Sequence, residues 1–334
     1  MFANAVASLD IVAKFSHVWW LYGLSLSSAG AGAFLCYLQL RPFGERSLRD
    51  FLAFVFPKRV IFHRSARLDL WFLLLRRLTL PFIIAPFIFS SATLAAWIAG
   101  KLTLAFGPPV PMQPTFASAA GLTLSLLLLN DFGYFVSHYL QHRLPLLWEF
   151  HKVHHAAPVL IPPTAWRIHP IDEIGRGLWI ALSSAVTGSI FLYLYPAGVA
   201  EVTVVGMDAY FISELLVCHS LRHSHLPLRF GYILESVFIS PAMHQLHHSI
   251  DPRYYDKNFG FLFAVWDRLL GTLILPDADT AYELGLSDGE HLAYDSVWAF
   301  YTLPVVNLFR RYGAPIGRRR MAGPASAPNA TTAE

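Results

Sequence analysis

Ten of the fifteen histidines lie in four short clusters whose spacing is that of metal ligands. The clusters are, in chain order, His138-x-x-x-His142, His151-x-x-His154-His155, His219-x-x-x-His223 and His244-x-x-His247-His248. Residues three or four positions apart share one face of a helix. Each cluster would therefore direct two or three imidazoles the same way, and imidazole binds zinc, copper, nickel and iron. The pattern predicts a metal centre.

The number of histidines favours two metal ions over one. A structural zinc takes four protein ligands, and a catalytic zinc usually takes three and a water molecule. Ten histidines are too many for one zinc, but they would give two metals about five ligands each and leave about one open position on each. We expect two non-haem iron ions that activate dioxygen. Zinc is expected as a replacement in purified protein, because it competes well for such ligands.

An iron pair held by neutral imidazoles would be electron-poor and able to abstract hydrogen from an unactivated C–H bond. Hydroxylation and desaturation both begin with that step, so the histidine pattern predicts either reaction. A membrane zinc hydrolase would be expected to carry a glutamate inside a cluster, as in H-E-x-x-H, and none of the four clusters has one. A metal transport protein would carry ionisable residues along several membrane spans, whereas here they concentrate at one face.

Four further residues are expected to support the metal ligands from outside. They are Asp131, His169, Asp208 and Asn258. Asp131 lies seven residues before His138, on the same helical face, and would accept the second N–H of an imidazole; a helix-packing contact is the alternative. His169 would contact a ligand or the substrate head group, Asp208 would act like Asp131 or face water within the bundle, and Asn258 would order the loop that closes the site.

The composition is that of a membrane protein. Hydrophobic residues make up 55% of the chain and charged residues 14%, with a mean hydropathy of +0.45; soluble domains average roughly 25% charged residues. A net charge of +3 gives no reason to expect a nucleic-acid partner. Cys36 and Cys218 lie in apolar stretches and are expected to be buried and unbridged.

The apolar segments predict an all-α integral membrane protein with a bundle of four or five transmembrane helices. The expected spans are 20–40, 78–100, 118–137 and two crossings within 178–217, with short re-entrant helices as the alternative for the last stretch. Amphipathic pieces at 51–63 and 68–77 are expected at the membrane surface. Nine basic residues against three acids in 41–77 place that segment in the cytoplasm. A helical, histidine-rich metal domain would then cap the bundle on the cytoplasmic face.

Five stretches resemble the fatty acid hydroxylase/sterol desaturase superfamily of integral-membrane di-iron enzymes. They are DFGYFVSHYLQHRLPLLWEFHKVHH (131–155), WRIHP (166–170), CHSLRH (218–223), SPAMHQLHHS (240–249) and NFGFLFAVWDRLLGT (258–272). The resemblance implies that all ten clustered histidines are metal ligands, with His219 and His223 in the least diagnostic cluster. It also implies a lipid substrate (fatty acyl, sphingolipid, sterol, alkylglycerol or carotenoid). Electrons would come from a small haem or iron–sulfur carrier and its reductase.

The chain divides into four expected parts. Residues 1–117 hold the first membrane spans and a basic interfacial loop, and 118–275 form the hydroxylase-like di-iron domain with its own spans. Residues 276–320 are a cytoplasmic extension, and 321–334, rich in Ala, Pro and Thr, are expected to be disordered. The lack of a fused donor domain favours a bacterial protein of the inner membrane.

Overall fold

The structure is a computed structural model that describes residues 2–110, 112–204, 207–277, 283–287 and 289–312. Within these residues every named element is a helix, and strand-like pairing is confined to isolated bridges such as that between Phe238 and Phe263. The predicted all-α class is confirmed. The predicted disordered tail, 321–334, lies outside the described residues.

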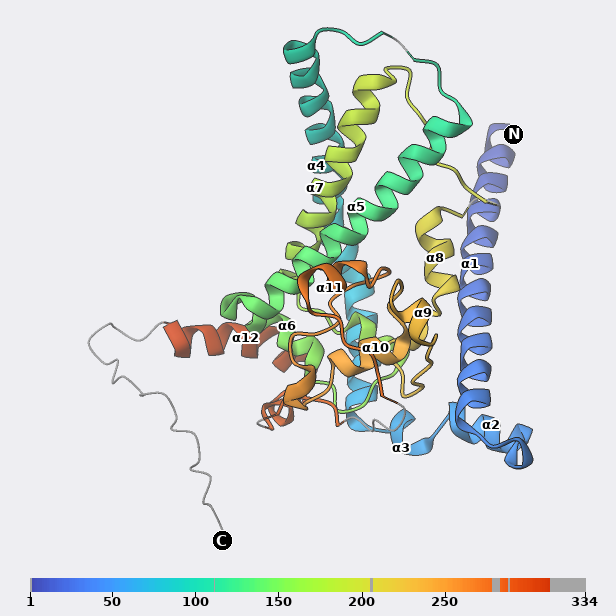
Figure 1. Ribbon diagram of the computed structural model, residues 1–334, viewed down its shortest axis with the longest axis vertical. Helices are drawn as coiled ribbons and strands as arrows, with labels where there is room; N and C mark the ends of the chain where they lie inside the picture. The colour runs from blue at the N-terminus through green and yellow to red at the C-terminus, as the bar shows by residue number, and fades with distance from the viewer. Residues whose placement is uncertain (1, 111, 205–206, 278–282, 288, 313–334) are drawn as a thin grey trace.

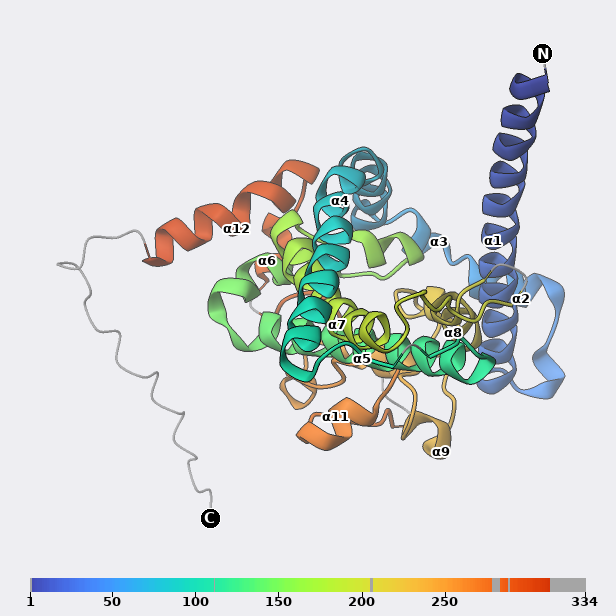
Figure 2. The ribbon, with the colours of Figure 1, turned by 90° about the horizontal axis from the view of Figure 1, so that it is seen from above.

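Four long helices run lengthwise through the molecule (Figure 1). They are α1 (Phe2–Leu40), α4 (Arg64–Phe106), α5 (Phe116–Arg143) and α7 (Pro170–Leu194). Helices α4 and α5 both pack against α7. Both views place α1 apart from these three, beside α2 (Leu48–Val55) and α8 (Ala209–Leu216) (Figures 1 and 2).

The short helices gather at one end of the long ones (Figure 1). Besides α2 and α8 they are α3 (Lys58–Ile61), α6 (Pro145–His155), α9 (Tyr232–Glu235), α10 (Pro241–His247), α11 (Val265–Leu270) and α12 (Val297–Tyr312), with 3₁₀ turns at Phe43–Glu45, Pro162–Trp166, His219–Leu221 (η3), Pro252–Tyr254 and Glu290–Ala293. Proline opens α6, α7 and α10, where its missing N–H costs no hydrogen bond. All four histidine clusters lie in this end of the molecule.

Three helices are long and apolar enough to cross a membrane: Trp20–Leu40, Phe116–Arg143 and Pro170–Leu194. They correspond to three of the expected spans. The expected span 78–100 lies within α4, whose 43 residues extend about 64 Å at 1.5 Å per residue. Its role as a further span remains a prediction. The expected surface piece 68–77 is not separate, because it forms the first turns of α4, while 51–63 falls on α2 and α3.

Of the two crossings expected in 178–217, only the first is a helix long enough to span a membrane, and the second is not. One long helix, α7, ends at Leu194, and the next helix, α8, has eight residues, about 12 Å, too short to cross a bilayer. Between them lie Pro196 and Gly198, the latter at φ +86°, which end helical structure. The chain returns from the far end of α7 through irregular backbone (Figure 1). The third and fourth clusters thus reach the same end as the first two.

Two contacts hold the long helices and the histidine end together. Gly133 of α5 lets that helix approach α7, since a Cβ there would come within 3.0 Å of the Trp179 carbonyl. Near the start of α4, the buried carboxylate of Asp69 pairs with Arg167 at 2.5 Å. Arg167 also donates to the Ala156 carbonyl at 3.2 Å, next to the second cluster. The buried pair therefore joins α4 to the backbone that follows α6.

Candidate metal centre

Nine of the ten clustered histidines converge in two adjoining groups. The first histidine group is His138, His142, His151, His155 and His247; the second histidine group is His154, His223, His244 and His248. In each group the candidate ligand atoms lie within 4.8 Å of one another. The groups touch, because the rings of His155 and His248 stack with centroids 4.4 Å apart. Helices α5, α6 and α10 supply most of these side chains, as the i, i+3, i+4 spacing requires.

The Nε2 atoms approach one another closely in both groups. The Nε2–Nε2 distances are 3.2 Å for His142–His155 and His151–His155, 3.0 Å for His154–His223, 2.9 Å for His223–His244 and 3.2 Å for His244–His248. Two nitrogens that each lie about 2.1 Å from one metal ion, at about a right angle, are about 3 Å apart. The spacing therefore fits a metal ion in each group.

Burial keeps six of these imidazoles neutral, which is the form that binds metal. It lowers the pKa of His154, His155, His223, His244 and His248 well below the ordinary value. Burial likewise lowers the pKa of His247 to about 3. At neutral pH each ring therefore keeps a lone pair for coordination.

Hydrogen bonds to the Nδ1 atoms, on the side of the ring away from the candidate ligand atom, orient two imidazoles of the first group. The Nδ1 atoms of His138 and His247 donate to the backbone carbonyls of Phe259 and Lys257, at 2.8 and 2.7 Å. A carbonyl can only accept, so Nδ1 carries the proton and Nε2 is the free ligand atom. The Nε2 atoms of His138 and His247 are both buried and have no hydrogen-bond partner in the described part of the chain, as expected for ligand atoms.

Carboxylates orient two more rings of this group. Asp172, buried in the first turn of α7, accepts from His151 Nδ1 at 2.9 Å and also binds the Gln141 side chain. Asp256 lies 3.5 Å from His142 Nδ1. In the second group the Nδ1 atoms have no hydrogen-bond partner among the described residues: those of His154, His223, His244 and His248. The two groups therefore differ in how firmly the protein orients them.

Sequence reasoning missed these outer acceptors. Two are backbone carbonyls, which no residue type reveals. Asp172 follows His169 by three positions and could have been found from the acidic first turn of a helix that begins at His-Pro. Asp256 sits at φ +56°, in a loop that places its carboxylate between His142 and Arg143.

Asp131 does not contact an imidazole, contrary to the expectation. Its carboxylate accepts from the backbone N–H of Leu262 at 2.7 Å, from that of Phe263 at 3.3 Å and from Trp266 Nε1 at 2.7 Å. A loop of irregular backbone leaves its amides unpaired, and a buried carboxylate is a strong acceptor for them. Asp131 thus anchors the 258–267 loop to α5.

Asp267 anchors the same loop from its other end. It accepts from the backbone N–H of Phe259 at 2.8 Å and of Gly260 at 2.7 Å. Asn258 donates to the carbonyls of Met243 and Ile274 at 3.0 and 2.9 Å. The loop that carries the Phe259 carbonyl is therefore fixed by side chains on both sides, and Asn258 has the loop-ordering contacts that the sequence suggested.

The other expected residues lie elsewhere. His169 caps α7 by accepting from Ile171 N at 3.1 Å, and Asp208 caps α8 by accepting from Phe211 N at 2.7 Å. Both expectations of contact with the metal ligands are wrong, because each side chain meets a helix N-terminus. His219 lies outside both groups, with its ring packed 4.4 Å from that of Phe261.

Replacing Asp172 with asparagine is expected to weaken metal binding in the first group by about 10–100-fold, the usual effect of losing an outer acceptor. The neutral amide orients the His151 ring less strongly than a carboxylate. The chelator concentration that removes half of the metal measures the change. Asp295→Asn is the control, since this exposed carboxylate pairs with Arg64 and belongs to neither histidine group. Equal metal retention in the Asp172 variant and wild type would contradict the assigned role.

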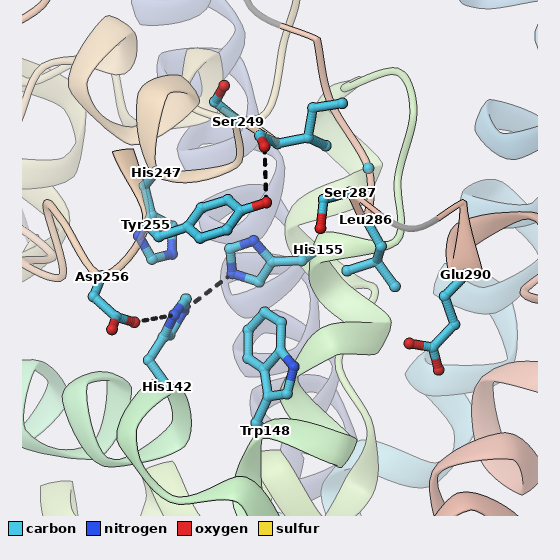
Figure 3. A pocket seen from close by; sticks show the side chains of 12 residues that line it. His142, Trp148, His155, His247, Ser249, Tyr255, Asp256, Leu286, Ser287 and Glu290 are labelled. Atoms are coloured by element: carbon cyan, nitrogen blue, oxygen red, sulfur yellow. Dashed lines mark hydrogen bonds and ion pairs between the residues drawn. The ribbon is translucent and has the colours of Figure 1, made fainter. Parts of the chain in front are cut away.

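A pocket of about 310 Å³ opens beside the first group. His142, His155 and His247 face it, together with Trp148 and Tyr255 (Figure 3). Asp256 and Glu290 lie at its polar rim (Figure 3). The first group is therefore accessible from this side to a small molecule.

The sequence profile of the fatty acid hydroxylase family matches residues 123–272, the segment that holds both histidine groups. The segment that carries both histidine groups is therefore similar to the fatty acid hydroxylase family. The first 122 residues lie outside the matched segment, and so do those after 272.

Among curated proteins, the chain is similar to the ornithine lipid hydroxylase OlsE of Rhizobium tropici, with 31% identity over 161 residues, 48% of this chain and 44% of that protein. It is 26% identical to an alkylglycerol monooxygenase of Caenorhabditis elegans, over 56% of this chain and 34% of that protein. A probable Delta(7)-sterol 5(6)-desaturase of Neurospora crassa is 25% identical over 46% of the chain and 38% of that protein. The chain thus spans less than half the length of these relatives. No solved structure is significantly similar to it.

Proposed function

We propose that this chain is a membrane-bound, non-haem di-iron oxygenase that hydroxylates an unactivated C–H bond of a lipid. The observation that carries the proposal is the pair of adjoining, largely buried groups made of imidazoles alone, with five and four members. The family and the relatives, which are named as lipid hydroxylases, monooxygenases and a desaturase, support lipid oxidation.

Two bound irons would supply dioxygen activation at this site. The residues of the chain supply the rest: Asp172 and the carbonyls at 257 and 259 keep the protons on Nδ1, so that Nε2 stays free. Overall, one oxygen atom enters the lipid C–H bond and the other leaves as water, with two electrons and two protons from a donor. A small haem or iron–sulfur carrier and its reductase would provide them.

The proposed topology places the histidine end on the cytoplasmic face, where a soluble carrier can reach it. The basic segment 41–77 lies at that end, and basic segments stay on the cytoplasmic side of membranes. In a bacterium the membrane would be the inner one.

Desaturation is the alternative that uses the same site. In that reaction a second hydrogen is removed and both oxygen atoms leave as water. A zinc hydrolase fits less well, because neither histidine group includes a carboxylate within the described part of the chain. The nearby Asp172 and Asp256 contact imidazole Nδ1 atoms, so they are poorly placed to act as a general base.

Expression in cells grown under ¹⁸O₂, followed by lipid mass spectrometry, tests the proposal. Hydroxylation predicts a new lipid that carries one ¹⁸O atom and requires iron in the medium. Desaturation predicts a lipid that has lost two hydrogens and gained no label. A hydrolytic product that forms equally without oxygen would overturn the oxygenase proposal in favour of the hydrolase.

A further inference from the structure

One buried arginine, Arg222, has no counter-ion among the residues that the structure describes. Three arginines of the described residues are buried, and two of them pair with carboxylates: Arg76 with Glu173 and Arg167 with Asp69, both at 2.5 Å. Arg222 is 1% exposed, yet no carboxylate lies within 4 Å of it in the described part of the chain. A buried charge without a partner is strongly destabilising. Its presence calls for an explanation beyond packing.

The hydrogen-bonding capacity of Arg222 is mostly unused by the protein. Its Nη2 donates to the Ile239 carbonyl at 3.1 Å, and its Nε is buried without a partner. A guanidinium has five N–H donors in a planar fork that matches carboxylate and phosphate oxygens. The guanidinium carbon lies 5.1 Å above the Phe261 ring, which holds the fork in place. Arg222 therefore has the geometry of an anion-binding residue.

The two carboxylates that interact electrostatically with Arg222, those of Asp131 and Glu214, do not occupy this role. The Asp131 carboxylate is already taken by the N–H groups of the 258–267 loop and by Trp266. Glu214 forms no ion pair with Arg222 within 4 Å. The positive charge is thus left for a ligand.

Arg222 lies where the long helices meet the histidine end. Around Phe261 stand the rings of Tyr134 on α5 at 4.8 Å, Tyr210 on α8 at 5.2 Å and His219 at 4.4 Å. Tyr134 is also 5.7 Å from the ring of His138, a member of the first group. His219 Nδ1 is buried and unpartnered as well. This aromatic cluster connects Arg222 to the metal centre.

A second guanidinium adds to the positive field. Arg176 on α7 lies 5.8 Å from the Tyr134 ring, on the same aromatic cluster. His219 interacts electrostatically with both Arg222 and Arg176. Arg176 binds Glu173 at 2.7 Å, a carboxylate that it shares with Arg76, whereas Arg222 binds no carboxylate within 4 Å among the described residues.

We propose that Arg222, assisted by His219, binds an anionic group of the lipid substrate, a carboxylate or a phosphate, and so selects charged lipids over neutral ones. The inference rests on the proposed lipid oxidation and names the class of lipid. Arg222 directly precedes His223, a member of the second group. Binding there holds the polar end of the lipid beside the histidines.

Binding of two lipids to the purified full-length protein in detergent tests the proposal. The probes are tritiated 1-O-hexadecylglycerol, which is neutral, and its 3-phosphate, which has the same tail. Wild type is expected to bind the phosphate form at least about tenfold more tightly, a difference of about 1.4 kcal/mol. Arg222→Gln should lose this preference and bind the neutral lipid as before, whereas Arg222→Lys should keep part of it.

The control is Arg253→Gln, which removes an exposed arginine paired with Asp251 and should leave both affinities unchanged. Metal content, measured on every variant, shows whether the histidine groups survive. A wild type without preference, or an Arg222→Gln variant that keeps metal and preference, overturns the inference. If the glutamine variant does not fold, the wild-type comparison and the lysine variant decide. Displacement by glycerol 3-phosphate as effectively as by the lipid would assign the site to free phosphate and also overturn it.

This assay needs neither oxygen nor electrons, so it separates the two proposals. Preference for the phosphate lipid without any ¹⁸O-labelled product would overturn the oxygenase proposal alone. A labelled product together with equal binding of both lipids would overturn the anion site alone.

Discussion

Replacing His247 or His244 with alanine is expected to lower the rate of lipid oxidation by about a thousandfold or more. Each removes a ligand from a different histidine group. A metal ion contributes several kcal/mol to transition-state stabilisation, and each 1.36 kcal/mol is about tenfold in rate. Both irons are required for the proposed chemistry, so either loss should suffice. The formation of labelled lipid and the metal content per chain measure the effect.

The two variants should differ in what remains bound. His244→Ala should lose the metal of the second group, whose Nδ1 atoms have no acceptor among the described residues, and His247→Ala that of the first. For the same reason a chelator should strip one metal per chain before the other from wild type. His225→Ala is the control, because His225 bonds the Phe54 carbonyl at 2.8 Å, outside both groups. Full metal content in both cluster variants would refute the assignment.

Replacing Asp69 with alanine is expected to destabilise the fold by about 3–5 kcal/mol, the cost of leaving a buried charge unpaired. Arg167 is 1% exposed and would lose its only carboxylate partner among the described residues. The contact that joins α4 to the backbone after α6 would be lost with it. Loss of ellipticity on heating in detergent measures the effect. The metal content should fall at the same temperature as the ellipticity, because His154 and His155 lie next to this backbone.

The control removes an exposed ion pair that Arg64, the first residue of α4, makes with a residue outside that helix. Asp295 binds Arg64 at 3.1 Å with both side chains more than half exposed. Exposed pairs contribute about 0–1 kcal/mol, so Asp295→Ala should melt close to wild type. Equal melting temperatures for the Asp69 and Asp295 variants would show that the buried pair does not hold the fold.

The spacing of the histidines predicted which side chains meet, because a helix fixes the relation between positions three and four apart. His154 and His155 show where this reasoning ends: neighbours in the sequence, they point into different groups. The division between the groups depends on how α6, α10 and η3 pack, and that is not local. Likewise Asp131 reads as an ionisable residue inside a span, and only the folded loop shows that its partners are backbone amides.

The apolar composition of 178–217 predicted a second membrane span that the structure does not have, for a related reason. Residues such as Tyr210 are apolar enough to suggest a membrane span, but they serve to surround the histidine end, where Tyr210 stacks on Phe261 at 5.2 Å. Composition does not distinguish burial in lipid from burial in protein. The length of a helix does distinguish them. Helix α8 is short because helical structure stops at Pro196 and Gly198 and resumes only after the N-cap residue Asp208.

The orientation of two metal-binding rings depends on main-chain oxygen atoms two positions apart, at Lys257 and Phe259. Side chains at such positions can be exchanged without altering the acceptor, so the frame is tolerant of substitution there. It is intolerant of a change in length. Deleting one residue between 257 and 267 would shift both carbonyls and the amides that Asp131 and Asp267 hold. Functional variants of this loop should therefore carry substitutions but keep the same number of residues. Sequencing the active members of a library in which the loop is randomised in sequence and length would show this pattern.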